Sequence, residues 1–283
     1  MNMNVTMIGA GSMAEALITG WLKSKKLLPE NIMVTNHSND LRLQELVNTF
    51  GVQTSRDQQT LTEHAHLFIL ACKPKDWESA LHRFKDTIEK NVPLVSVMAG
   101  VTTESMENYF PSIDVPVIRT IPNTSAIVNA SMTPFAIGKW VTQTQRNIIE
   151  QLFQLVGETA EVPEEQMDAM TALTGTGPAY IYYLMESMEI AAGKIGIEKH
   201  LARDLVAQTL LGASVRVQKK ELSPAMLYQQ IMSPGGTTEA GFEVLQEQGL
   251  QKTMIECIQR AHERSKELGE STGIVKTNRN TNA

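Results

Sequence analysis

Residues 5–14 read VTMIGAGSMA, a short apolar run that leads directly into a glycine-rich turn. The apolar run predicts a buried strand, and the residues after the turn predict the start of a helix. In this context Gly9 permits a tight turn, Gly11 lets the backbone approach a pyrophosphate, and Ala14 allows close packing of helix on strand. The helix amino terminus adds N–H donors and the positive end of a dipole. The segment therefore predicts a dinucleotide-binding turn, with a plain glycine-rich turn as the alternative.

Short apolar runs alternate with helical patterns through the first half of the chain. The runs are continuous, as expected of strands covered on both faces, and lie at Val5–Gly9, Ile32–Asn36, Leu67–Ala71, Leu94–Met98, Val117–Thr120 and Phe135–Ile137. Helical patterns fall between or after them, as at Leu41–Phe50, Trp77–Lys90 and Gln145–Val156. This alternation predicts a Rossmann-like, doubly wound parallel sheet over residues 1–162.

The pattern changes after Val162, where strand signals stop and long helical patterns take over. These patterns cover Pro178–Lys194, Leu201–Lys219, Glu239–Gln248 and Leu250–Leu268, and they predict an all-α carboxyl-terminal domain over residues 163–269. The first of them is apolar on almost every side, which requires burial all round. We therefore expect a second subunit to cover it. Residues 270–283 are polar and aperiodic, and we expect them to be disordered.

Composition excludes several classes of protein. The chain has 283 residues, of which 42% are hydrophobic and 20% charged, as in an ordinary globular protein of about two domains. Its net charge of -6, without a basic block, argues against nucleic acid as a partner. No apolar run approaches the ~20 residues of a membrane helix and no signal peptide is evident, so we expect a cytoplasmic protein. The two cysteines suggest no disulfide framework, and the histidines show no metal-ligand spacing.

The end of the second predicted strand distinguishes between nicotinamide cofactors. Sites that prefer NAD usually place an acid there to bind the ribose 2′-hydroxyl. Here residues 35–38 read TNHS, and the first acid is Asp40. Neutral donors, with Arg42 nearby in the sequence, suit a 2′-phosphate and favour NADPH over NADH. The alternative is that these residues only cap the next helix, for which Ser38 is a suitable N-cap.

Three further clusters carry polar groups to the ends of predicted elements. Residues 71–74 (ACKP) and 119–124 (RTIPNT) each lie at the carboxyl end of a predicted strand, at the edge where ligands of open α/β sheets gather. Residues 233–238 (SPGGTT) form a glycine turn that feeds a helix amino terminus, which is an anion site by construction. Ser233, Thr237 and Thr238 add hydroxyl donors there. The alternatives are structural loops and a well-capped helix start.

The motifs occur in a recognisable order, namely Gly9–Ala14, Ala71–Pro74, Ser96–Val101, Pro122–Thr124, Gly175–Tyr180 and Ser233–Thr238. With them the chain resembles pyrroline-5-carboxylate reductase from residue 3 to about residue 269. The resemblance implies reduction of 1-pyrroline-5-carboxylate to L-proline, the last step of proline biosynthesis, with NADPH or NADH. It also implies a Rossmann domain followed by a helical domain that interleaves with a partner into a homodimer. Such dimers often assemble further as a pentamer of dimers.

The resemblance also implies roles for single residues. It assigns cofactor binding to Ile8, Gly9, Ala10, Gly11, Ser12, Met13, Asn36, Ser38, Ala71, Lys73, Pro74, Ala99, Asn123 and Glu164. It assigns substrate binding to Ser233, Gly236, Thr237, Thr238 and Glu221, with Thr238 as the catalytic group that orients the ring nitrogen. The chain departs from the family at a few positions. His37 stands where members often have Arg, Gln58 where they often have Asn, and Ser125, Asn129 and Ala130 replace residues usually Pro, usually Gly and often Glu.

Two other functions fit parts of the sequence. A 3-hydroxyisobutyrate-type dehydrogenase has a similar domain plan, with the pattern G-x-G-x-x-x-K-x-x-N after the linker. Here the glycines are followed by Ile181 and Leu184 at the Lys and Asn positions, so the catalytic lysine of that family is missing. A non-catalytic redox sensor that binds NADP is the other alternative. The intact segment Ser233–Thr238 argues against it, because a sensor has no need of a carboxylate pocket.

Overall fold

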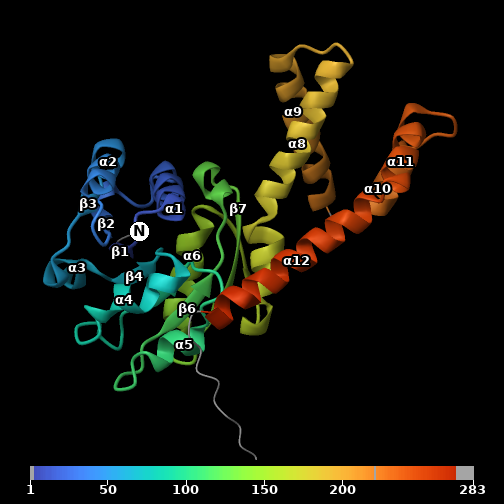
Figure 1. Cartoon of the computed structure of the whole chain (residues 1–283). Helices are drawn as coiled ribbons and strands as arrows, with labels where there is room; N and C mark the ends of the chain where they lie inside the picture. The colour runs from blue at the N-terminus through green and yellow to red at the C-terminus, as the bar shows by residue number, and fades with distance from the viewer. Residues whose placement is uncertain (1–2, 220, 272–283) are drawn as a thin grey trace, which may run out of the picture. The chain divides into compact units, whose positions relative to one another are not determined.

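The computed structural model describes residues 3–219 and 221–271 (Figure 1). The chain forms two compact units: the first runs to Thr176 and resumes at Ala261, and the second spans Gly177–Arg260. The predicted boundary at Val162 thus lies inside the first unit of this division. Of the tail that the sequence predicts to be disordered, residues 270 and 271 end the last helix, and residues 272–283 lie outside the described part.

The first unit is built on one eight-stranded sheet in the order β3-β2-β1-β4-β5-β6-β7-β8. Its strands are Val5–Ile8 (β1), Ile32–Thr35 (β2), Gln53–Thr54 (β3), Leu67–Leu70 (β4), Leu94–Ser96 (β5), Val117–Thr120 (β6), Ser131–Ile137 (β7) and Gly157–Glu161 (β8). Strands β1 to β6 are parallel. The predicted α/β fold class, a Rossmann-like domain followed by helices, is confirmed.

The sheet differs from a wholly parallel one at its end. Strand β7 pairs antiparallel with β6, and β8 pairs parallel with β7. The reversal follows from the connection between β6 and β7, which contains only the 3₁₀ turn Thr124–Val128 and no crossover helix. The sequence did not reveal β3 or β8, because both are polar edge strands that remain partly exposed.

Helices cover both faces of the sheet in the first unit. They are Ser12–Lys23 (α1), Asp40–Phe50 (α2), Gln58–His64 (α3), Trp77–His82 (α4), Thr103–Asn108 (α5), Gln143–Gln154 (α6), Met167–Met170 (α7) and the end of Leu250–Ser271 (α12). Helix α4 stops well short of the predicted Lys90. The chain continues in turns that bury Phe84 and Ile88, and the β-branched pair Thr87 and Ile88 is a weak helix former.

Alternate strand residues pack into two separate cores, one on each face of the sheet. Met7 and Val34 pack on one face with α1 and α6, where Trp21 is fully buried and donates a 3.0 Å hydrogen bond to the carbonyl of Leu152. On the opposite face, Ile8 and other strand residues pack with α4, α5 and the turns after α4. Burial on both faces explains the continuous apolar runs in the sequence.

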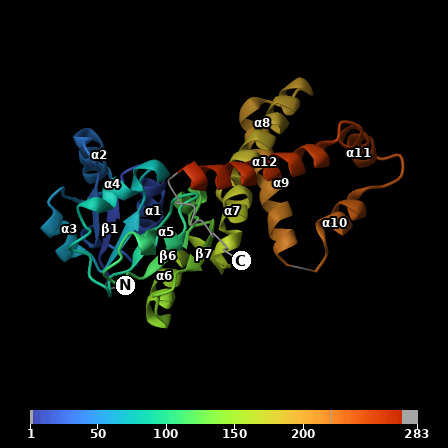
Figure 2. The same cartoon turned by 60° about the horizontal axis from the view of Figure 1, so that its bottom comes forward.

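The second unit is all helical, as predicted. Its helices are Gly177–Lys194 (α8), Lys199–Gln218 (α9), Pro224–Ile231 (α10), Thr237–Glu247 (α11) and the first half of α12. Helices α8 and α9 pack against each other (Figures 1 and 2). Many large apolar side chains of α8 and α9 nevertheless remain exposed, with Tyr182 at 58% and Tyr183 at 74%. The single chain therefore leaves much of the apolar surface of these helices uncovered.

Candidate cofactor and substrate site

The order of the strands reverses at β1, which lies between β2 and β4. The register aligns the carboxyl ends of the central strands, since Ile8 pairs with both Thr35 and Leu70, and Leu70 pairs with Ser96. Open α/β sheets bind ligands outside the carboxyl ends of their strands at such a switch point. The residues that follow these strands, Gly9, Asn36, Ala71 and the loop 97–101, therefore lie along one sheet edge.

The turn after β1 approaches the end of β4 closely. Gly9 has φ +122°, its N–H donates to Thr35 at 2.9 Å, and the N–H of Ala71 donates to Ile8 at 2.9 Å. A Cβ atom added at Gly9 would collide with the backbone of Ala71 and would lie 2.7 Å from the nitrogen of Cys72. Only glycine fits this position, for both conformational and steric reasons.

The amino terminus of α1 is open. Gly11 is its N-cap, with extended backbone, and no described side chain caps the helix. An added Cβ at Gly11 would meet nothing within 4 Å. The first N–H groups of a helix have no intrahelical partner, and together with the helix dipole they favour an anion. The residues present thus fit the pyrophosphate of a dinucleotide, as the sequence predicts.

The loop after β2 is ordered by its own side chains. Asn36 accepts from the N–H of Asn39 at 3.0 Å and donates to the carbonyl of Asn39 at 2.7 Å. Asn39, and not Ser38, is the N-cap of α2, because its side chain accepts from the N–H of Arg42 at 2.9 Å. The alternative reading of Ser38 as a helix cap is therefore wrong, and Ser38 lies exposed in the loop.

Arg42 is committed to protein partners. Its guanidinium donates to the carbonyl of Ala10 at 2.9 Å and pairs with the carboxylates of Glu15 and Glu45. The hydrogen bond to Glu15 is the largest cause of a raised pKa of Arg42, followed by that to Glu45. Arg42 therefore braces the phosphate turn against α1 and α2, and two carboxylates already balance its charge.

The loops after β4 and β5 contact each other at the predicted nicotinamide end. Lys73 is the N-cap of the 3₁₀ turn Pro74–Asp76, which follows Ala71 and Cys72. The thiol of Cys72 lies 3.6 Å from the sulfur of Met98, and burial raises the pKa of Cys72 to about 11. A neutral thiol thus lies between these loops and adds no charge to the sheet edge.

Asn123 and the residues near it hold the connection from β6 to β7. The side chain of Asn123 is buried, accepts from the N–H of Ser125 at 3.0 Å and donates to the carbonyl of Thr174 at 3.0 Å. Asn129 adopts φ +56°, a conformation that glycine or asparagine tolerates, and its amide donates to the carbonyls of Gly20 and Leu155. The departure from glycine at Asn129 thus keeps the backbone conformation and adds two hydrogen bonds.

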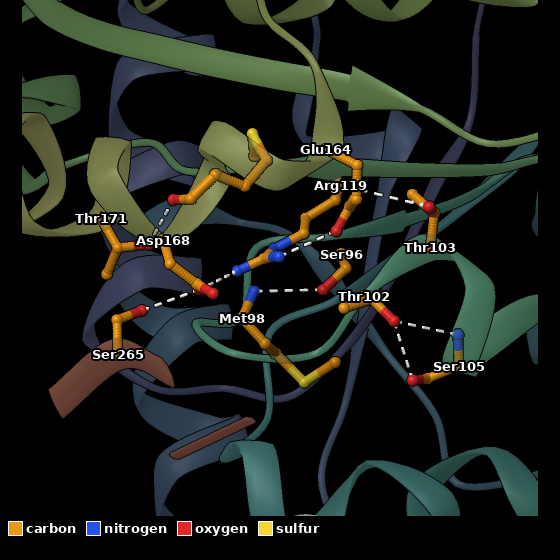
Figure 3. A network of polar contacts seen from close by, with 11 residues as sticks. Ser96, Met98, Thr102, Thr103, Ser105, Arg119, Glu164, Asp168, Thr171 and Ser265 are labelled. Carbon is orange, nitrogen blue, oxygen red and sulfur yellow. Dashed lines mark hydrogen bonds and ion pairs between the residues drawn. The ribbon is translucent and has the colours of Figure 1, made fainter. Parts of the chain in front are cut away.

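A buried ion-pair network surrounds Arg119 of β6 (Figure 3). The side chain of Arg119 is 1% exposed and pairs with Glu164 and with Asp168, each at 2.8 Å. Glu164 also accepts from Thr103 at 3.2 Å, and Asp168 accepts from Ser265 at 2.9 Å. Within the described residues, Nε of Arg119 has no hydrogen-bond partner.

The predicted cofactor residue Glu164 therefore has a structural partner in this network. Neither Asp168 nor Ser265 stands out in the sequence as a site residue. The one available signal was an arginine inside the apolar strand VIRT, because a buried guanidinium requires carboxylate partners. The identity of those partners was hidden, since they come from other segments of the chain.

The glycine turn before α11 has the predicted local geometry. Gly235 has φ +70°, the N–H of Gly236 donates to the carbonyl of Ser233 at 2.9 Å, and Gly236 is the N-cap. The carboxylate of Glu239 accepts from the N–H of Gly235 at 2.6 Å, so this terminus already attracts an anion. Thr237 and Thr238 are the first residues of α11, and Thr238 is partly buried. Glu221 is exposed in the turn between α9 and α10.

Comparison with known proteins identifies the family. A model described as pyrroline-5-carboxylate reductase dimerisation matches residues 164–268, and one described as NADP oxidoreductase, coenzyme F420-dependent, matches residues 4–100. Pyrroline-5-carboxylate reductase 1 of Bacillus subtilis (strain 168) is 41% identical over 94% of this chain and 89% of its own length. The chain belongs to the pyrroline-5-carboxylate reductase family. The resemblance drawn from the motifs is thereby confirmed.

Solved structures agree with this family. Pyrroline carboxylate reductase of Plasmodium falciparum, solved with NADP bound, is 27% identical with a TM-score of 0.87, and the match covers 95% of this chain and 98% of that one. A pyrroline-5-carboxylate reductase from Coxiella burnetii is 34% identical with a TM-score of 0.81, over 95% and 99% of the two chains. The family is one of NAD(P)H-dependent oxidoreductases, which agrees with the phosphate turn after β1.

The described residues hold neither a metal-binding cluster nor a membrane-spanning helix. Across residues 3–219 and 221–271, histidine, cysteine and acidic side chains form no group of three that could hold a metal ion. Helices in the same part of the chain are too short or too polar to cross a bilayer.

Proposed function

We propose that this chain reduces 1-pyrroline-5-carboxylate to L-proline, the last step of proline biosynthesis, with NADPH preferred and NADH as the alternative cofactor. The observation that carries the proposal is the uncapped amino terminus of α1 beside Gly9, which lies at the switch point of the sheet. It is the expected place for a dinucleotide in a chain that belongs to this reductase family. The bound nicotinamide would supply the hydride. The chain's own residues bind and orient the two reactants, which is chiefly a positioning task.

The cofactor residues divide along the sheet edge. The backbone of Ile8–Met13 would bind the pyrophosphate, and Asn36 with Ser38 would face the adenosine ribose. Ala71, Lys73, Pro74, Ala99 and Asn123 would line the nicotinamide end, with Glu164 on the same side. The aligned carboxyl ends of β1, β2, β4 and β5 support this division. The side chain of Asn123 already bonds to Ser125 and Thr174, so its contribution would be to shape the site rather than to bind directly.

The substrate residues lie at the amino terminus of α11. Ser233, Gly236 and Thr237 would hold the substrate carboxylate on the N–H groups of the first turn, which have no intrahelical partner. Thr238 would hydrogen-bond the ring nitrogen. A threonine hydroxyl is a poor acid, so it would hold the ring in orientation more than supply the proton. Glu221 would be the acid of this pocket, as the family resemblance implies.

The assembly is part of the proposal. A second copy of the chain would cover the exposed apolar residues of α8 and α9, and the dimerisation model that matches residues 164–268 supports this. We place the functional domains at 1–162 and 163–269, and five such homodimers would form a decamer. We further place the enzyme in the cytoplasm, where Cys72 and Cys257, which are not paired, would stay reduced.

One assay tests the reaction. NADPH oxidation is followed with 1-pyrroline-5-carboxylate, other cyclic imines and 2-oxo acids, and NADP+ reduction is followed with 3-hydroxy acids. We expect turnover with the five-membered imine and none with hydroxy acids in the oxidative direction. Oxidation of a 3-hydroxy acid would favour the dehydrogenase instead, and tight NADP binding without any turnover would favour the sensor. Light scattering at micromolar concentration should give at least a dimer.

A further inference from the structure

Two arginines donate hydrogen bonds to two consecutive residues, Thr35 and Asn36, at the carboxyl end of β2. Arg83, which caps the end of α4, donates to the hydroxyl of Thr35 at 3.1 Å. Arg56, in the loop between β3 and α3, donates to the carbonyl of Asn36 at 3.2 Å and to its side-chain oxygen at 2.9 Å. Two guanidinium groups from separate loops are therefore anchored to consecutive residues of one strand end.

The two guanidinium groups are close enough to repel each other. Burial is the larger cause of a lowered pKa of Arg83, and the positive charge of Arg56 is the second. Arg83 has no carboxylate within ion-pair distance among residues 3–219 and 221–271, and its other contact is the ring of Phe84 at 4.8 Å. Like charges in partly buried positions raise the energy of the free protein unless an anion balances them.

Arg42 and Arg56 differ in how readily they can take an incoming anion. Arg42 already carries two carboxylates, Glu15 and Glu45, on one guanidinium. Arg56 has one acidic partner, Asp40, whose side chain is 81% exposed. An exposed carboxylate loses little when it turns into solvent, because exposed ion pairs contribute about 0–1 kcal/mol. An anion of higher charge could therefore displace Asp40 from Arg56.

We propose that Arg56 and Arg83 bind the 2′-phosphate of NADPH and thereby set the cofactor preference of this enzyme. The inference rests on the proposed function for the position of the adenosine ribose, at the end of β2. It replaces Arg42 as the basic residue expected to favour NADPH. Arginine suits the task because its planar, forked donors match phosphate oxygens, and a phosphate dianion satisfies two guanidinium groups at once.

The test measures binding of two probes by calorimetry, 2′,5′-ADP and 5′-AMP, which differ by the 2′-phosphate alone. The quantity compared is the ratio of the dissociation constant for 5′-AMP to that for 2′,5′-ADP. We expect a ratio well above one for the native chain. Arg56→Gln and Arg83→Gln should each lower it about tenfold, as for loss of one charge-assisted hydrogen bond, and the double variant should lower it further. Glutamine keeps a donor for Asn36 or Thr35 but removes the charge.

Arg146→Gln is the matched control, because Arg146 pairs with Glu150 and Glu161 on α6 and β8 and should leave the ratio unchanged. Asp40→Asn tests the same site in the opposite direction. It removes the competing carboxylate from Arg56 and should raise the ratio about two- to fivefold. If Arg83→Gln does not fold, Arg56→Gln and Asp40→Asn still decide the matter.

An unchanged ratio in both Arg56→Gln and Asp40→Asn would overturn the proposal, as would a native ratio near one. The reductase assay separates this outcome from failure of the proposed function. If the native chain prefers 2′,5′-ADP but does not turn over 1-pyrroline-5-carboxylate, the proposed phosphate site stands and the proposed reaction is wrong. If it turns over equally with NADH and NADPH, the proposed reaction stands and the proposed phosphate site is wrong.

Discussion

Ser265 donates a 2.9 Å hydrogen bond to the carboxylate of Asp168, from which it is separated by 97 positions in the sequence. The bond ties the end of α12 to the buried Arg119 network of the first unit (Figure 3). One turn further on, Gly269 packs so closely on Gly100 that a Cβ at Gly100 would lie 2.7 Å from the nitrogen of Gly269. The end of the last helix thus braces the loop that carries Ala99.

Ser265→Ala should destabilise the first unit. Ser265 is 3% exposed, and its loss leaves Asp168 with one hydrogen-bond partner fewer. We expect the free energy of unfolding in urea to fall by about 1–2 kcal/mol. Ser79→Ala, which removes an exposed hydroxyl bonded to the carbonyl of Asp76, is the matched control and should change it by less than about 0.5 kcal/mol. Equal effects of the two variants would contradict the role given to Ser265.

Arg119→Leu should lower the free energy of unfolding by more than Ser265→Ala does. It leaves Glu164 and Asp168 facing a buried apolar side chain, and breaking a buried ion pair by removing one partner costs about 3–5 kcal/mol. Arg146→Leu removes an arginine that also has two carboxylate partners, but at the surface, where the expected loss is about 1 kcal/mol or less. The comparison is made by urea unfolding. Similar losses for both arginines would show that the network of Arg119 is not effectively buried.

Thr238→Ala should reduce turnover and leave NADPH affinity unchanged. The phosphate turn lies in the first unit and Thr238 in the second, so loss of its hydroxyl should affect only the substrate. A hydrogen bond to a charged group contributes about 1.5–3 kcal/mol, which corresponds to a fall in kcat/KM of roughly ten- to a hundredfold. Thr238→Ser should recover part of this loss.

Ser233→Ala is expected to act mainly on KM, because a carboxylate contact forms before the reaction and persists through it. Steady-state kinetics and NADPH titration by fluorescence distinguish these cases. If Thr238→Ala weakened NADPH binding and left turnover intact, the assignment of residues 233–238 to the substrate would be wrong.

Alkylation of Cys72 should be slow near neutral pH. In a Cys257→Ser background Cys72 is the sole thiol, and its pKa of about 11 follows from burial, which disfavours the thiolate. The thiolate is the reactive form, so the rate with iodoacetamide should rise about tenfold per pH unit between roughly pH 7 and 10 without a plateau. Mass spectrometry of the intact protein follows the reaction. A plateau near pH 9 would show an ordinary, solvated thiol, as expected of the same variant in urea.

Much of the architecture could be predicted from local patterns. The phosphate turn, five of the parallel strands and the long carboxyl-terminal helices all carry strong signals, because buried strands are apolar on both faces and helices repeat every 3.6 residues. The role of Gly9 in the tight turn was predictable as well. The structure gives the reason, since the positive φ and the contact with Ala71 exclude every other residue there.

The partners of the polar groups were decided by tertiary structure alone. Nothing near Arg119 in the sequence points to Asp168 or to Ser265, and nothing near Asn36 points to Arg56 or Arg83. The edge strands β3 and β8 were hidden as well, because their polar residues carry no apolar pattern. Apolar burial imposes a periodic pattern on a segment and can be read locally, whereas a hydrogen bond or an ion pair depends on two groups that only the folded chain brings within 3 Å.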